Sequence, residues 1–378
     1  MLKIPSIKSL EDFLLQDSKT SDLVAAGDTK AKSPDTILTA KQVKHEVSVF
    51  SRVLINVYCG WPFHDEILKR RVLQILTDIY KNAHDMTSLE LLEQLKQAIE
   101  IIPDNHINLR MIGHGKEVRT GLRKQRPNVG SNVAGDDKFV VKFKNDIGII
   151  GIRTLSKWST EEQESFEQQW RKILPRSKVL IVDIRDNGGG SSRPIETLAR
   201  YILGYRYPPA RKEIIRNNPD ANAVKQLYKN SDIDKFNVDS ADDPVVFKDH
   251  STEVLPEFDS EHAGFTGPIY VLTNGRVMSS GEIFCTNMRY YPNVKFIGTN
   301  TRGGEVYGYN YAYILLPHSN MTFNVGCVYR DMFVKNFELN GYKPDIECKD
   351  GTNAMDVALS QIGTDITKIL SNNNGLEK

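Results

Sequence analysis

The sequence predicts an α/β protein, in which a helical N-terminal subdomain precedes a largely parallel sheet covered by helices. Two observations predict this class. Between residues 40 and 102, apolar residues recur at helical spacing, which indicates three helices. From residue 179 onward, short buried-strand patterns alternate with helical patterns. Such alternation is typical of a largely parallel sheet covered by helices.

The composition is that of an ordinary soluble globular protein. Of 378 residues, 40% are hydrophobic and 26% charged, and 49 Lys+Arg against 48 Asp+Glu give a net charge of +1. This balance provides no overall attraction to nucleic acid or to an anionic membrane, so we expect no nucleic-acid partner. No run of about 18 apolar residues predicts a membrane span.

The cysteines and the first residues bear on the compartment. The four cysteines form no C-x-x-C pair, which favours a reducing environment. Residues 1–16 lack the apolar centre of a secretory signal. We therefore expect a cytoplasmic protein, unless a signal has been removed and the protein is secreted or periplasmic.

The order of the elements predicts four parts. Residues 1–38 are expected to form an N-terminal arm, residues 39–103 the helical subdomain, residues 104–363 the α/β core and residues 364–378 a C-terminal tail. Within the core we expect strands at 107–112, 139–143, 147–152, 179–184, 269–273 and 294–297, helices at 195–203, 282–289 and 354–362, and a hairpin at 311–316 and 321–328.

A charged insertion at about 205–264 interrupts the alternation of the core. At roughly 60 residues it is too long for a plain connection. It holds one weak helical pattern, at 221–228, and an acidic run at 239–243. We expect it to cover the active-site cleft and to select the substrate.

Three glycines follow the predicted strand at 179–184. Gly188, Gly189 and Gly190 would allow a sharp turn and leave main-chain N–H groups bare near the start of the next helix. Such groups stabilise a phosphate or an oxyanion. Neither a Walker lysine nor G-x-G-x-x-G spacing accompanies them, so a nucleotide site is not indicated. A tight turn without chemistry is the alternative.

Ser279 follows another predicted strand and precedes a helix. A serine at a helix N-terminus is well placed for nucleophilic attack, because the free N–H groups favour the developing negative charge. Ser279 and Glu282 also form an S-x-x-E capping box, which would explain the serine without catalysis. A nucleophile would further need a base.

His106 and Glu338 complete the candidate residues. His106 lies between the helical region and the first strand, where it could serve as a base or as a structural hydrogen-bonding residue. Glu338 precedes a turn at Gly341 and Pro344, and could be a surface carboxylate. The histidines show no metal-ligand spacing, so neither zinc nor another cofactor is predicted.

Three motifs together resemble the C-terminal processing (tail-specific) serine peptidase family. They are D-x-R-x-N-x-G-G at 183–190, S-x-x-E at 279–282 and G-x-x-P-D-I at 341–346, and the resemblance covers residues 45–350. It implies the twisted-sheet core of that family and a peptidase, without metal or cofactor, that acts on a peptide or protein substrate.

The resemblance also indicates a branch of the family. The better-known branch uses a Ser–Lys dyad in a T-x-G-K-G stretch, but residues 301–305 read T-R-G-G-E, with glycine at the lysine position. The chain is instead similar to the catalytic core of tricorn protease, which uses serine, histidine and glutamate. About 30 residues separate His106 from the strand at 139, too few for the family's usual PDZ-like domain.

The resemblance implies a role for each candidate. Ser279 would be the nucleophile, His106 the base and Glu338 the carboxylate that orients the imidazole. Asn105 stands where tricorn has a serine that links histidine to glutamate, and Glu305 is a rival acidic partner. The oxyanion would be bound by N–H groups of Gly188 or Gly189 and of Ser280.

A non-catalytic binding protein on the same scaffold is the alternative, as in the retinoid-binding relatives of this family. The missing lysine and the missing PDZ-like domain favour it, whereas the presence of Ser279, His106 and Glu338 together disfavours it.

Overall fold

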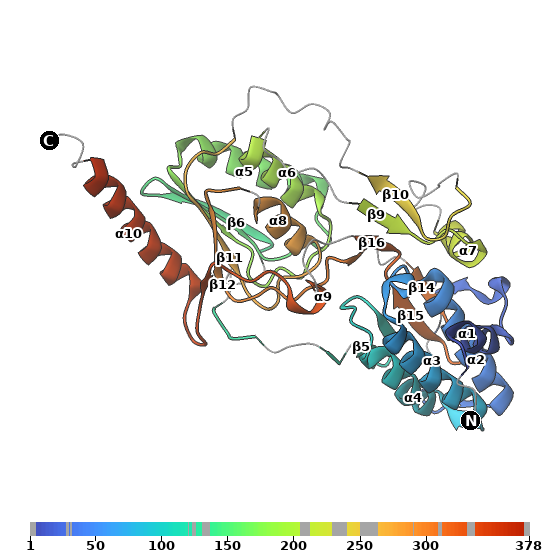
Figure 1. Ribbon diagram of the computed structural model, residues 1–378. Coiled ribbons are helices and arrows are strands. Elements are labelled where there is room, and N and C mark those ends of the chain that lie inside the picture. The colour runs from blue at the N-terminus through green and yellow to red at the C-terminus, as the bar shows by residue number, and fades with distance from the viewer. Residues whose placement is uncertain are drawn as a thin grey trace. The chain divides into compact units, whose positions relative to one another are not determined.

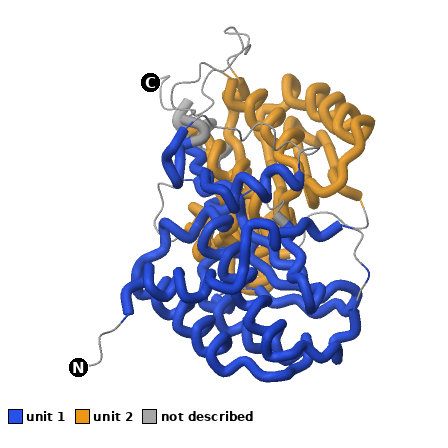
Figure 2. Tube along the Cα trace, turned by 90° about the vertical axis from the view of Figure 1, so that its right-hand side faces the viewer, with its two compact units in different colours: residues 1–123, 210–251, 306–335 blue, residues 124–209, 252–305, 336–378 orange. Residues whose placement is uncertain are grey.

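The computed structural model describes residues 5–27, 30, 32–119, 121–122, 126–130, 137–204, 212–228, 240–249, 264–289, 291–308, 312–330 and 337–373. The chain forms two compact units, each built from three separate segments (Figure 2). Unit 1 comprises residues 1–123, 210–251 and 306–335, and unit 2 comprises residues 124–209, 252–305 and 336–378.

Four helices open unit 1: α1 (Ile7–Leu15), α2 (Ala40–Arg52), α3 (Glu66–Lys81) and α4 (Ser88–Glu100). Each begins at a side-chain cap, because Ser6, Thr39, Asp65 and Thr87 accept a backbone N–H of the first turn. The last three helices match the predicted periodicity. Helix α1 lies within the stretch that was expected to form an arm, and it packs against α2 and α3.

A five-stranded antiparallel sheet completes the main part of unit 1. Its order is β1 (Val24–Ala25), β14 (Ala312–Leu315), β15 (Met321–Val325), β4 (Asn108–Met111) and β5 (Glu117–Arg119). Strand β4 follows α4 after a short turn and pairs with β15, so that Met111 lies opposite Met321. This pairing fixes the turn that carries His106. A small pair joins β2 (Ile37–Leu38) and β3 (Met86–Thr87).

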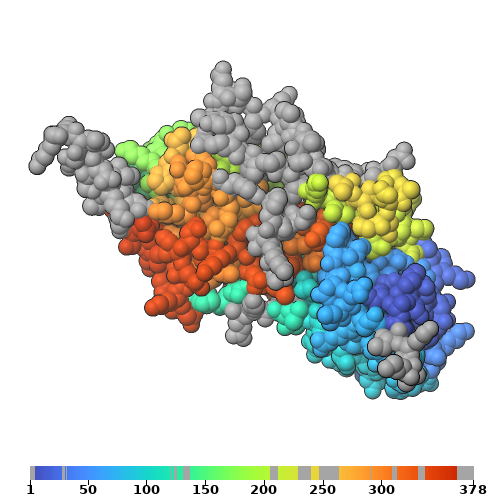
Figure 3. Space-filling view, viewed as in Figure 1, coloured from blue at the N-terminus to red at the C-terminus, as the bar shows by residue number. Residues whose placement is uncertain are grey.

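The described parts of the predicted insertion belong to unit 1. They form β9 (Lys212–Ile215), α7 (Pro219–Leu227) and β10 (Val245–Asp249), in a second sheet ordered β10, β9, β16 (Val328–Arg330) and β13 (Tyr307–Gly308). Helix α7 contacts β1, and Figure 3 shows this region (yellow) at the surface beside the N-terminal segment (blue). Of the acidic run, residue 239 lies outside the described residues.

An ion pair stabilises this second sheet. The Arg216 guanidinium contacts both carboxylate oxygens of Asp243, at 2.8 and 2.9 Å, and also donates to the carbonyl of Ile55. The last residue of the predicted acidic run is therefore part of the packing of unit 1.

Unit 2 contains the predicted α/β core. Its six-stranded sheet is ordered β17 (Ile346–Glu347), β12 (Val294–Gly298), β11 (Ile269–Thr273), β8 (Val179–Asp183), β7 (Ile147–Ile152) and β6 (Phe139–Lys144). All neighbours pair in parallel except β6 and β7. The α/β class predicted from the sequence is confirmed, with a mixed, twisted sheet.

Helices cover this sheet on both faces. Helices α5 (Thr160–Ile173), α6 (Arg193–Leu203) and α8 (Ser280–Arg289) lie together on one face (Figure 1). On the other face, α10 (Ala354–Asn373) contacts β11 and β12, and its residues Ala354, Ala358 and Ile362 share one apolar cluster with Val179 and Ile181 of β8. Strands β8 and β11 are therefore buried on both sides, as their continuous apolar runs predict. In the described part of the chain, no helix combines the length and apolar character needed to cross a membrane.

Candidate active site

Ser279 lies in the turn between strand β11 and helix α8 of unit 2. Its backbone φ is 53°, in the left-handed region that costs a non-glycine residue about 1–2 kcal/mol. The Ser279 carbonyl accepts the N–H groups of Glu282 at 2.8 Å and Ile283 at 3.2 Å, which start the helix. The strained turn thus places a half-buried serine at a helix N-terminus, the kind of position where strain is stored at functional sites.

The structure does not contain the capping box that could have explained Ser279. A capping box would turn the Glu282 carboxylate back to the N–H of Ser279. The Glu282 carboxylate is instead fully buried, and it accepts the Thr301 hydroxyl and, at 2.8 Å, the N–H of Gly303. Among the described residues of unit 2, none forms a hydrogen bond with the Ser279 hydroxyl. That hydroxyl is therefore left for chemistry.

The glycine loop lies directly against the serine turn. Gly189 has φ 91°, and a Cβ added there would lie 2.8 Å from the Cβ of Ser279. The Ser280 hydroxyl donates to the carbonyl of Gly190 at 2.6 Å. Two segments 90 residues apart in the sequence, which were singled out separately, therefore form one site. A side chain at position 189 would separate them.

The predicted oxyanion donors differ in their hydrogen bonding. The N–H of Gly189 donates to the Asn187 side chain at 3.0 Å. Among the described residues, the N–H groups of Gly188 and Ser280 have no acceptor. Gly188 is exposed, whereas Ser280 starts helix α8. The two donors that remain available are therefore those of Gly188 and Ser280.

The first two residues of the D-x-R-x-N-x-G-G motif have a structural role. The Arg185 guanidinium is 2% exposed and bonds both carboxylate oxygens of Asp183, at 2.9 and 2.7 Å. It also donates to the carbonyl of Val129 and to the side chain of Asn353, at the start of α10. This buried ion pair therefore connects the end of β8 to the start of α10, and it fixes the position at which the glycine loop begins.

The Glu305 carboxylate contacts the middle of helix α8. It accepts the Thr286 hydroxyl at 2.6 Å, and Thr286 also contacts the hydroxyl of Tyr342. Thr286 is seven residues after Ser279, which corresponds to about 10 Å along a helix. These contacts give Glu305 a packing role in the interior of unit 2.

Glu338 lies in the short helix α9 (Phe337–Asn340) and is buried. A Cβ on Gly303 would overlap the carbonyl oxygen of Glu338, so this backbone approach requires glycine. Gly341, with φ 60°, packs equally closely on Thr301. The Arg126 guanidinium donates to the carbonyls at the end of α9. The G-x-x-P-D turn and the loop at 301–303 therefore hold the segment that carries Glu338.

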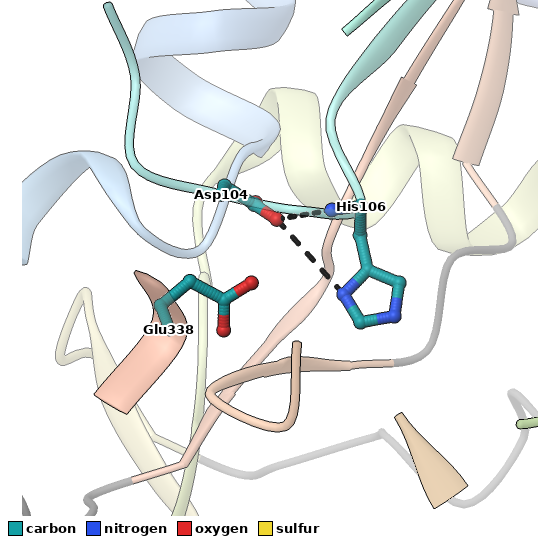
Figure 4. A group of neighbouring side chains, drawn as sticks. All are labelled: Asp104, His106 and Glu338. Atoms are coloured by element: carbon teal, nitrogen blue, oxygen red, sulfur yellow. Dashed lines mark hydrogen bonds and ion pairs between the residues drawn. The ribbon is translucent and has the colours of Figure 1, made fainter. Parts of the chain in front are cut away.

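His106 lies in unit 1, in the turn between α4 and β4, and its side chain is 8% exposed. The carboxylate of Asp104 accepts the N–H groups of His106 at 2.7 Å and of Ile107 at 3.3 Å. The same oxygen lies 3.9 Å from Nδ1 of His106 (Figure 4). Asn105, between them, is buried as well. The turn thus places a buried carboxylate beside the imidazole.

Burial raises the pKa of Asp104 to about 7, because the hydrogen bonds from His106, Tyr58 and Ile107 offset only part of the desolvation. The Tyr58 hydroxyl also lies 3.2 Å from Nε2 of His64, whose pKa burial lowers to about 4. The sequence analysis missed both Asp104 and Tyr58. An aspartate two residues before a histidine is a local signal for an Asx turn, but nothing in the sequence connects Tyr58 to that turn.

The described residues of each unit, taken by itself, contain no group of three His, Cys, Asp or Glu side chains whose ligand atoms meet at one point. Unit 2 contains the strained serine with N–H donors beside it, and unit 1 contains the histidine beside a carboxylate.

Comparison with known proteins identifies the family of this fold and these motifs. The family model described as Peptidase family S41 matches residues 146–348, which is more than half of the chain. The chain belongs to peptidase family S41. No curated protein sequence matches this S41 chain.

Solved structures are similar to this S41 chain at low sequence identity. A putative peptidase from Parabacteroides merdae has a TM-score of 0.59 and 18% identity, over 86% of this chain and 96% of that one. A lipoprotein from Streptococcus agalactiae has a TM-score of 0.44 and 15% identity, over 89% and 99%. Tricorn protease has a TM-score of 0.32 and 16% identity, over 59% and 18%. The first of these supports the fold.

Proposed function

We propose that this member of family S41 is a serine peptidase in which Ser279 attacks the peptide carbonyl and His106 acts as the base. The observation that carries the proposal is the strained backbone of Ser279, at the start of α8 and against Gly189. A non-glycine residue is held in such a conformation at an energetic cost, and strained residues of this kind cluster at active sites.

The proposed reaction proceeds through an acyl-enzyme. Ser279 Oγ forms a bond to the carbonyl carbon of the substrate, and Nε2 of His106 takes the hydroxyl proton and passes it to the leaving amine. Water then attacks the ester, and His106 again accepts and returns the proton. The proposal requires His106 of unit 1 to reach Ser279 of unit 2.

The remaining candidates have supporting roles in the proposal. The N–H groups of Gly188 and Ser280 bind the oxyanion. The N–H of Gly189 would first have to break its hydrogen bond to the Asn187 side chain.

Glu338, assisted by Asn105, orients the imidazole. Glu305 is the weaker candidate for this role, since its carboxylate is engaged by Thr286 in the middle of α8.

A fluorophosphonate probe tests the proposal directly. The probe is expected to modify one serine, with loss of its fluoride, and peptide mapping should locate the adduct on Ser279. Labelling and peptide hydrolysis should both disappear in Ser279→Ala. The matched control is Ser165→Ala, which removes an exposed hydroxyl from helix α5 of the same unit.

The alternative function gives a different result. A protein that only binds a ligand or a peptide on this scaffold would be folded but would not react with the probe, and Ser279→Ala would leave its ligand binding intact. An adduct on another serine, or equal labelling of the wild-type protein and Ser279→Ala, would contradict the proposed nucleophile.

A further inference from the structure

We propose that Asp104 is a positioning residue for His106, whose carboxylate orients the imidazole and stabilises its protonated form during the reaction. The inference rests on the proposed function, in which His106 is the base. It adds to that function a carboxylate from the same turn as the histidine, in unit 1.

The backbone of the turn fixes the relative position of the two side chains. Oδ1 of Asp104 accepts the N–H of His106 at 2.7 Å and that of Ile107 at 3.3 Å, so the carboxylate cannot rotate away without losing both bonds. The same oxygen lies 3.9 Å from Nδ1 of His106. This distance is longer than a hydrogen bond but short enough for a strong interaction with an imidazolium.

Within unit 1, His106 is the group that can carry a positive charge beside the buried Asp104 carboxylate. Asp104 is completely buried, and His106 is its only ion-pair partner among the described residues of unit 1. Among the described residues of unit 1, Tyr58 donates its hydroxyl to Asp104, and burial raises the pKa of the neighbouring Cys59 thiol, which keeps that thiol neutral near pH 7.

This arrangement matches the charge changes of the reaction. When Nε2 of His106 takes the proton of Ser279, a positive charge forms on the ring beside the buried carboxylate. Asp104 neither gains nor loses a proton in this step. Attraction between the two groups raises the pKa of His106 and stabilises the imidazolium, which is the form present in the transition state.

The test compares Asp104→Asn with the wild-type protein. Asparagine keeps the Oδ1 acceptor for the two N–H groups and removes the charge. The pKa of His106 is measured by NMR on histidine-labelled protein, with its resonance assigned from His106→Gln. We expect the pKa of His106 to fall by about one unit in Asp104→Asn. We expect kcat to fall about 10- to 100-fold with little change in KM, and the acid limb of kcat/KM to move to lower pH by the same amount as the NMR pKa.

The matched control is Asp85→Asn, because Asp85 also accepts a backbone N–H in unit 1 but is exposed. It should leave the pKa of His106 unchanged. If Asp104→Asn does not fold, Tyr58→Phe provides the second test. Loss of the Tyr58 hydroxyl raises the pKa of Asp104, so less carboxylate is present at pH 7 and the apparent pKa of His106 should fall.

An unchanged pKa of His106 in folded Asp104→Asn, or in Tyr58→Phe where the first variant does not fold, would overturn the proposal. A fall of the His106 pKa in Glu338→Gln but not in Asp104→Asn would leave Glu338 alone in this role and would overturn the Asp104 proposal as well. The NMR titration needs no turnover. Failure of the Asp104 proposal therefore shows in the titration, whereas failure of the peptidase proposal shows as a lack of Ser279 labelling.

Discussion

Ser279 combines backbone strain with a hydroxyl that has no hydrogen-bond partner among the described residues of unit 2. The positive φ of Ser279 has an energetic cost. The close contact with Gly189 and the hydrogen bonds of the first turn of α8 hold the backbone in this conformation. If that cost is retained for catalysis, its removal should improve stability and abolish activity together.

The first prediction compares Ser279→Gly with Ser279→Ala. Both variants lack the hydroxyl, so neither should react with a fluorophosphonate. Glycine adopts φ near 53° without a penalty, so Ser279→Gly should be about 1 kcal/mol more stable than Ser279→Ala in chemical denaturation. Equal stability would show that the turn relaxes, and that strain is not a property of this site.

The second prediction concerns the buried Glu282. Desolvation raises its pKa well above the usual value, and Thr301 and Gly303 oppose this only in part. The folded protein therefore retains a proton that the unfolded chain loses above about pH 4.5. The contribution of protonated Glu282 to the free energy of unfolding is therefore fully present below about pH 4.5. It should decrease as the pH rises toward the pKa of Glu282 in the folded protein. Denaturation curves at pH 5 and 8 should show a smaller loss for Glu282→Gln than for the wild-type protein. An equal loss in both would contradict the raised pKa.

At the scale of elements, the glycine loop should tolerate a methyl group at one position and not at the next. A Cβ added at Gly188 would meet open space, whereas at Gly189 a Cβ would meet Ser279 at 2.8 Å with φ 91°. Gly188→Ala should keep the melting temperature within about 2 °C, and Gly189→Ala should lower stability by about 2 kcal/mol or more. Labelling of Ser279 should also decrease in Gly189→Ala. Equal melting temperatures for the two variants would contradict the close approach.

The sheet formed by β9 and β10 should be sensitive to acid through Asp243. Burial would raise the pKa of this carboxyl, but hydrogen bonds from Arg216 and Asn218 outweigh it and lower the pKa to about 2. The unfolded chain binds the proton near pH 4, so this stabilisation is present above about pH 4 and is lost as the pH falls to 2. It amounts to about 1–2 kcal/mol after allowance for partial exposure. Asp243→Asn should remove this part of the acid dependence in denaturation measured between pH 5 and 3. An unchanged acid dependence would show that the ion pair does not stabilise the sheet.

The sequence predicted those elements whose buried residues form a recognisable pattern within a short stretch of chain. The apolar runs of β8 and β11 and the start of α8 were predicted within a few residues. Helix α5 was missed, because only Phe166, Trp170 and Ile173 of its 14 residues are buried. The packing role of Asp243 also escaped prediction, since its partner Arg216 is 27 residues away.

At the scale of the whole molecule, the chain passes three times into each unit, and this interleaving was not predicted. It depends on pairings such as β4 with β15, which join residues about 210 apart and leave no local signal. The candidate residues could be proposed from the sequence, because each stands beside glycines or a turn and within a motif that resembles the family's pattern. What the sequence could not provide was the φ of Ser279 and the contact of Tyr58 with Asp104, since both arise from packing. Ser279, Glu305 and Glu338 fall in unit 2 and His106 in unit 1, so the roles assigned to them remain predictions.

The rate at which a fluorophosphonate modifies Ser279, measured against pH in the wild-type protein and in His106→Gln, tests the central claim most directly. The account predicts a wild-type rate that rises with pH through the histidine range, because only neutral imidazole accepts the serine proton. It predicts a rate at least about 100-fold lower in His106→Gln, without that rise. Modification of Ser279 at an undiminished rate in folded His106→Gln, or a wild-type rate independent of pH between about 5 and 8, would contradict it.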